Sequence, residues 1–132
     1  MILHLSGKEL DAHYLGYFEC FNQQLFYEAH DVLEELWLPQ RKIDGGLFFK
    51  GLIQLAGAFV HLQKDRLRPA AALFKLSRSN LENFVSPYQQ LDTTAILALI
   101  DEWLTKLETT DFSSNPLSLS EPPRIQLIEI GR

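Results

Sequence analysis

The sequence has few of the residues that disulfide frameworks and nucleic-acid surfaces require. It contains one cysteine, Cys20, in 132 residues, so no disulfide can form within the chain and nothing points to an oxidising compartment. Its 12 Lys and Arg residues are outnumbered by 17 Asp and Glu residues, which gives a formal net charge of -5. Because nucleic-acid binding requires clustered cations to neutralise phosphates, this balance predicts no nucleic-acid partner.

The sequence also predicts no segment that directs the protein into a membrane. Its opening residues, Met-Ile-Leu-His-Leu-Ser, have no basic region before a long apolar run, as a secretory signal has. The most apolar stretch, residues 45–62, contains Lys50, Gln54 and His61, which are costly to place in hydrocarbon. We therefore expect a soluble cytoplasmic protein in which this stretch is a buried helix rather than a membrane span.

Motifs for nucleophilic catalysis and phosphate binding are missing as well. No Gly-x-Ser-x-Gly elbow occurs, and no glycine-rich phosphate loop precedes a helix. Cys20 lies among aromatic residues, where a thiol is usually buried and unreactive.

What the sequence does contain is apolar residues at helical spacing. The pattern predicts five helices: one that opens at the capping-box sequence Ser6–Glu9, and others over about residues 25–38, 45–64, 69–85 and 92–107. Short loops between them predict an all-α, compact bundle, with residues 1–108 as one helical domain. Residues 109–120 are rich in Ser, Thr and Asn, and Arg124–Ile130 are apolar and β-branched. We expect residues 109–132 to be a linker and an extended tail that docks on this subunit or on a neighbour.

A polar stripe on the third predicted helix is the first candidate for a functional site. At about 100° per residue, Lys50, Gln54, Gly57 and His61 fall within roughly 60° of one another. The rest of the helix is apolar, and burying an unpaired polar group costs about 1–3 kcal/mol. These side chains therefore need partners, which we expect on the second helix, or else water or a ligand.

The second helix supplies further candidates. His30 and Glu34 stand four residues apart on one margin of its apolar face, whereas Glu28 lies on the opposite margin and Asp31 on the outward side. The candidate polar site is therefore Glu28, His30, Glu34, Lys50, Gln54 and His61.

Three interpretations of this group remain open. It is a buried hydrogen-bond network, with His30 satisfied by a carboxylate and His61 by a carbonyl. Alternatively, His30, Glu34 and His61 bind zinc, iron or manganese. In the third, Lys50 and Gln54 orient a small anionic ligand between the second and third helices. Since no spacing matches a metalloprotease or di-iron helix motif, we expect no bound metal and no other cofactor.

Three segments carry a resemblance to a known family. They are Phe21-Asn22, the run Phe26-Tyr-Glu-Ala-His-Asp-Val-Leu-Glu-Glu-Leu-Trp37, and Lys50-Gly-Leu-Ile-Gln-Leu-Ala56. Together they resemble the small helical proteins of domain of unknown function family 309, over about residues 10–85. Tyr27 stands where that family usually has Trp, and Asp31 where it often has Glu. The resemblance implies an all-helical fold, and it implies no established activity.

These observations predict a binding or interaction module whose partner is another protein or a second copy of the chain. The alternative is a metal-dependent hydrolase with His30, Glu34 and His61 as ligands and Glu28 as the candidate base. A pocket for a small anionic ligand is the further alternative.

Overall fold

The computed structural model describes residues 10–43, 45–119 and 121–128. Six α-helices run in the order α1 (Ala12–Asn22), α2 (Phe26–Trp37), α3 (Gly46–Gln63), α4 (Leu67–Leu81), α5 (Thr93–Thr109) and α6 (Pro116–Leu119). A short 3-10 turn, η1 (Leu38–Gln40), extends α2 at Pro39. No strand occurs in these ranges, so the predicted all-α fold is confirmed. The sixth helix, α6, is a single turn inside the segment that was expected to be a linker.

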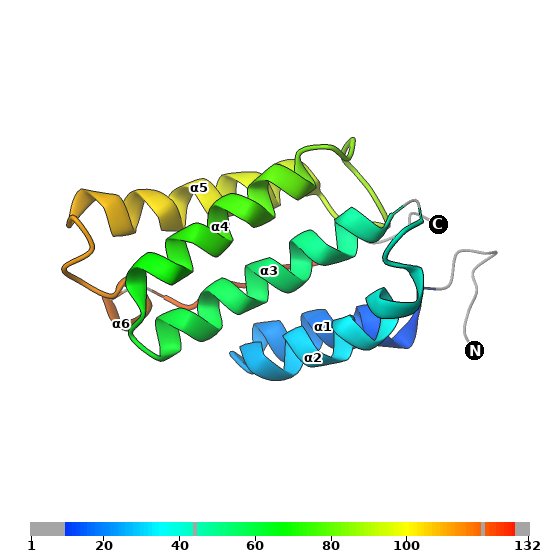
Figure 1. Ribbon diagram of the computed structural model, residues 1–132, viewed down its shortest axis with the longest axis horizontal. Helices are drawn as coiled ribbons and strands as arrows, with labels where there is room; N and C mark the ends of the chain where they lie inside the picture. The colour runs from blue at the N-terminus through cyan, green and yellow to red at the C-terminus, as the bar shows by residue number, and fades with distance from the viewer. Residues whose placement is uncertain (1–9, 44, 120, 129–132) are drawn as a thin grey trace.

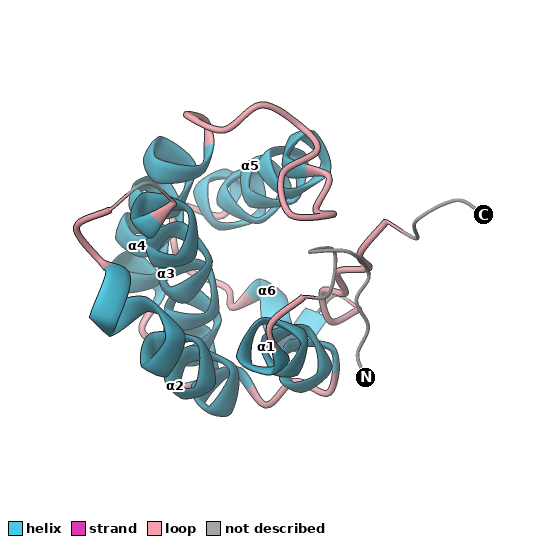
Figure 2. Ribbon diagram, turned by 90° about the vertical axis from the view of Figure 1, so that its right-hand side faces the viewer, coloured by secondary structure: helices cyan, strands magenta, loops and turns pink. Residues whose placement is uncertain are grey.

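The helices form two layers. Figure 1 shows α3 between α4 and α2, and it packs against both. Figure 2 shows α5 and α1 in a second layer, with α6 and the extended residues after it between them. Most residues of α3 are buried, and its neighbours bury fewer, which confirms residues 45–64 as the most buried helix. None of the helices in the described ranges combines the length and apolar character needed to cross a membrane.

One aromatic side chain of α3 marks the centre of the core. The ring of Phe59 lies 5.5 Å from Phe21 on α1, 5.0 Å from Phe26 on α2, 5.1 Å from Phe74 on α4 and 5.0 Å from Trp103 on α5, measured between centroids. Most of these pairs are edge-to-face, and such pairs add about 0.5–1.5 kcal/mol each beyond the area they bury. Phe59 therefore links the four other long helices through one residue.

Two glycines occupy positions that disfavour a side chain, one because of its backbone conformation and the other because a neighbouring helix lies close. Gly45 precedes α3 with φ of 89°, a left-handed conformation that side chains disfavour. Within α3, a Cβ on Gly51 would lie 2.7 Å from Leu81 Cγ on α4. The same close approach lets Ser77 Oγ donate a hydrogen bond of 2.7 Å to the Gly51 carbonyl. Gly51 is thus a point where α3 and α4 lie against each other.

The helix ends correct one prediction and confirm another. Asp11, rather than Ser6, caps α1, because its side chain accepts a 2.7 Å hydrogen bond from the His13 amide. Ser6 and Glu9 lie outside the described residues. Asp92 caps α5 as expected, and its side chain accepts from the Ala95 amide at 3.0 Å.

Residues 121–128 are extended and lie against the helices. Ile125 is buried, Leu127 is half-buried and Ile128 is exposed. The side-chain amide of Asn22, at the end of α1, donates to the Ile125 carbonyl at 2.8 Å and accepts from the Ile125 amide at 2.7 Å. Ile130, which was expected to contribute to the tail's packing, lies outside the described residues.

Candidate functional site

Three polar side chains converge on one margin of α2. His30, Asp31 and Glu34 each offer one ligand atom, and these three atoms lie within 4.8 Å of one another. His30 Nδ1 is 3.3 Å from Asp31 Oδ1. The grouping follows from the helix itself, because residues four apart share a face and Asp31 reaches across from the adjacent position. We call these three residues the α2 cluster.

The separation of His30 and Asp31 suits two ligands of one divalent metal ion. Bonds of about 2.0–2.1 Å to a tetrahedral zinc ion place neighbouring ligand atoms about 3.3 Å apart. The His30 and Asp31 side chains are 32% and 52% exposed, so an ion there keeps coordination positions open to solvent. At the same separation the ring and the carboxylate share a hydrogen bond, which satisfies His30 through a carboxylate when no ion is bound.

The His30 ring lies beside Gly57 of α3. Its Cδ2 atom lies 4.0 Å from the position that a Cβ on Gly57 would occupy, and Leu73 of α4 contacts the same position at 3.1 Å. The ring of Tyr27, also on α2, is nearly parallel to that of His30 with a centroid separation of 6.4 Å. A Cβ on Gly57 would be in ordinary contact with the imidazole, so the missing side chain makes room for Leu73 rather than for His30.

Gln54 finds its partner on a different helix from the one predicted. Its side-chain oxygen accepts a 2.8 Å hydrogen bond from Asn80 of α4, not from α2. The reason is its angular position, since Gln54 is offset from Gly57 toward the α4 side of α3. Lys50 is exposed. Of the two side chains proposed to orient an anionic ligand, Gln54 is therefore already engaged in a contact between α3 and α4.

His61 stays apart from the α2 cluster. The group of ligand atoms within 4.8 Å includes Asp31, on the helix's outward side, and does not include His61. The Nδ1 atom of His61 is buried and has no hydrogen-bond partner among the described residues, so this nitrogen makes no bond to a carbonyl there. Burial, followed by the charges of Arg66 and Lys64, lowers the pKa of His61.

Glu28 lies on the opposite margin of α2, facing α1. It is exposed, and its charge acts on Cys20 of α1. Burial first, then Glu28 and Glu19, raises the pKa of the Cys20 thiol. This half-buried thiol is therefore held in its protonated, unreactive form. Glu28 and His30 do not meet at one centre.

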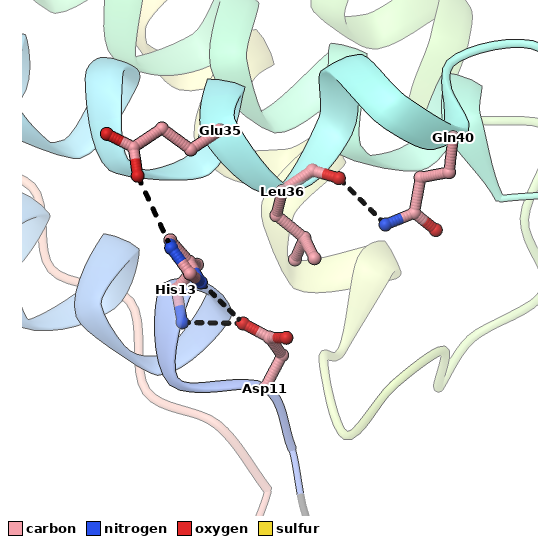
Figure 3. A network of polar contacts seen from close by, with 5 residues as sticks. All are labelled: Asp11, His13, Glu35, Leu36 and Gln40. Atoms are coloured by element: carbon pink, nitrogen blue, oxygen red, sulfur yellow. Dashed lines mark hydrogen bonds and ion pairs between the residues drawn. The ribbon is translucent and has the colours of Figure 1, made fainter.

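A second histidine with two carboxylate partners was not anticipated from the sequence. His13 Nδ1 lies 3.0 Å from Asp11, and its Nε2 lies 3.4 Å from Glu35 of α2, as Figure 3 shows. The two carboxylates approach opposite nitrogens of the ring, so they do not converge on one point. The contacts join the start of α1 to α2. Recognising Asp11 as the helix cap, two residues before His13, would have predicted the contact between His13 and Asp11 but not the contact with Glu35.

A pocket of about 420 Å³ lies where α3 begins. Arg41, Lys42 and the Tyr88 side chain contribute polar groups, and the remaining lining residues are Ile43, Gly45, Leu47 and Phe84. It is separate from the α2 cluster, since the two share no residue.

The site belongs to a small all-helical domain with a histidine–carboxylate cluster beside one buried central helix. Residues 14–73, from α1 into α4, match the family model described as Domain of unknown function (DUF309). The matched part of the chain carries the α2 cluster, and the match confirms the resemblance to this family. A search of curated proteins and a search of solved structures found no match.

Proposed function

We propose that this chain is a binding domain whose ligand at the α2 cluster is an exchangeable divalent metal ion. The observation that carries the proposal is the convergence of His30, Asp31 and Glu34 within 4.8 Å. One imidazole nitrogen and two carboxylate oxygens suit zinc, manganese or iron(II).

The geometry favours exchange over permanent retention. All three ligands come from one helix, and the cluster is partly exposed, so water completes the coordination. An ion held in this way leaves when metal is scarce. We therefore keep the expectation that the isolated protein carries no stoichiometric metal, and we expect binding when zinc or manganese is supplied.

Calorimetric titration of the chelator-treated protein with Zn²⁺ and with Mn²⁺ tests the proposal. Since losing even an outer-shell partner weakens metal binding by about 10–100-fold, His30→Ala should weaken it by more than about tenfold. His13→Ala is the matched control, because His13 also has two carboxylate neighbours but on opposite ring nitrogens. Equal losses in the two variants, or no saturable binding to the unmodified chain, would reject the site.

The hydrolase alternative lacks its proposed base at this cluster. Metal-dependent hydrolysis needs a group that takes a proton from the attacking water. Glu28, the candidate for that role, lies on the opposite margin of α2 and faces Cys20. The arrangement therefore supports binding better than hydrolysis.

A further inference from the structure

The extended segment after α6 is bound as peptides are bound by recognition domains. Its side chains alternate along the segment: Pro123 and Ile125 are buried and Leu127 is half-buried, whereas Arg124 and Gln126 are exposed. Alternation with period two means that one side of the segment faces the protein and the other faces solvent. The bound pattern is therefore Pro-x-Ile-x-Leu.

The main chain of the segment is recognised by groups fixed elsewhere in the fold. Asn22 pairs with both the amide and the carbonyl of Ile125, at 2.7 and 2.8 Å. Three residues further on, the Ile128 amide donates to the Gln90 carbonyl at 2.8 Å. Hydrogen bonds to an extended main chain, combined with sites for alternate side chains, are the basis of extended-peptide recognition. We call the surface between Asn22 and Gln90 the docking surface.

The extended segment lies on the surfaces of the helices and is not itself one of the helices of the bundle. Figures 1 and 2 show it between α1 and α5 in the second layer. Arg124 Nη1 adds a longer contact of 3.4 Å to the Asn22 carbonyl.

We propose that the docking surface recognises an extended segment of a protein partner with the pattern Pro-x-aliphatic-x-aliphatic, and that the chain's own residues 123–127 are its built-in competitor. The chain between α5 and Pro123 includes α6, which packs on α3 and α5, so the competitor is tethered beside the surface at a high effective concentration. A free segment of equal intrinsic affinity is therefore excluded until the tail is displaced. This inference does not depend on the metal proposal, because the two sites share no residue.

The test uses the full chain with Ile125→Asp, which places a charge where the buried side chain sits and releases the tail. A fluorescently labelled peptide of residues 121–128, Glu-Pro-Pro-Arg-Ile-Gln-Leu-Ile, is added and its anisotropy is followed. We expect saturable binding to Ile125→Asp and at least about tenfold weaker binding to the unmodified chain, since the tethered tail competes. Adding Asn22→Ala to Ile125→Asp should abolish binding of the peptide. A peptide in which Asp replaces the isoleucine that corresponds to Ile125 should not bind to Ile125→Asp.

Circular dichroism establishes that each variant keeps its helices. If Ile125→Asp unfolds, Ile125→Ala takes its place. Unfolding of both variants overturns the proposal, because the segment is then a fixed part of the core. A folded variant that does not bind the peptide at millimolar concentration overturns it as well. An unmodified chain that elutes as a dimer, and as a monomer after Ile125→Asp, would instead assign the surface to the tail of a second copy.

Discussion

Replacing Gly51 by alanine tests whether the contact between α3 and α4 is as close as the structure shows. A new Cβ would lie 2.7 Å from Leu81 Cγ and 2.8 Å from its Cδ2. Leu81 is fully buried, so its side chain has little room to move away. Overpacking of this kind costs about 1–3 kcal/mol, against a gain of about 1 kcal/mol for replacing glycine inside a helix. We expect Gly51→Ala to lower the free energy of unfolding by about 0–2 kcal/mol.

Gly16 of α1 provides the matched control. A Cβ there would meet only Val32 Cγ2 within 4 Å, at 3.7 Å, which is an ordinary contact. Gly16→Ala should therefore raise the free energy of unfolding by about 0.5–1 kcal/mol.

Urea unfolding followed by circular dichroism measures both variants. Leu81→Ala completes a double-mutant cycle, because removing the obstructing side chain should make Gly51→Ala less costly. If Gly51→Ala stabilises the chain as much as Gly16→Ala does, the close approach of the two helices is refuted.

Three further outcomes are expected. Because burial and nearby cations lower the pKa of His61, the unfolded chain binds the extra proton below the ordinary histidine pKa near 6.5. His61→Gln should therefore remove part of the stability loss seen in urea titrations as pH falls from about 7 to 5, and an unchanged pH profile would contradict this. Asn80→Ala should cost about 0.5–1.5 kcal/mol through its bond to Gln54, and additive effects in a cycle with Gln54→Ala would show that the bond contributes nothing. Deleting residues 121–132 removes the burial of Ile125, which contributes about 1.5–3 kcal/mol, and should lower the melting temperature by about 5 °C or more. If the truncated chain melts and elutes like the full chain, the segment does not contribute to stability or assembly.

Helical periodicity was sufficient to predict the fold class and the central helix. The apolar residues of 45–64 recur around the whole helix, which is typical of burial by neighbours on several sides, and α3 is packed in this way. The first helix start was predicted wrongly because the prediction rested on the capping-box spacing of Ser6–Glu9, whereas α1 is capped by Asp11, whose side chain accepts the amide hydrogen bond of His13.

The candidate site was predictable only within a single helix. His30 and Glu34 share a margin of α2 because of their spacing alone, so the sequence identified them together. Spacing gives no information on which neighbouring helix a polar stripe faces, and so it paired Gln54 with α2 rather than with Asn80 of α4. Asp31 was placed on the outward side by its angle, but its side chain is long enough to reach the His30 ring.

The pairing of Asn22 with Ile125 spans 103 residues, and this separation has a consequence during synthesis. At translation rates of about 5–20 residues per second, α1 emerges roughly 5–20 s before Ile125 is made. During that interval the nascent chain can form its helices while the main-chain groups that pair with Asn22 do not yet exist. Helices α2 to α6 are all made within that interval, so the segment docks on a surface that is completed only shortly before Ile125 itself is made.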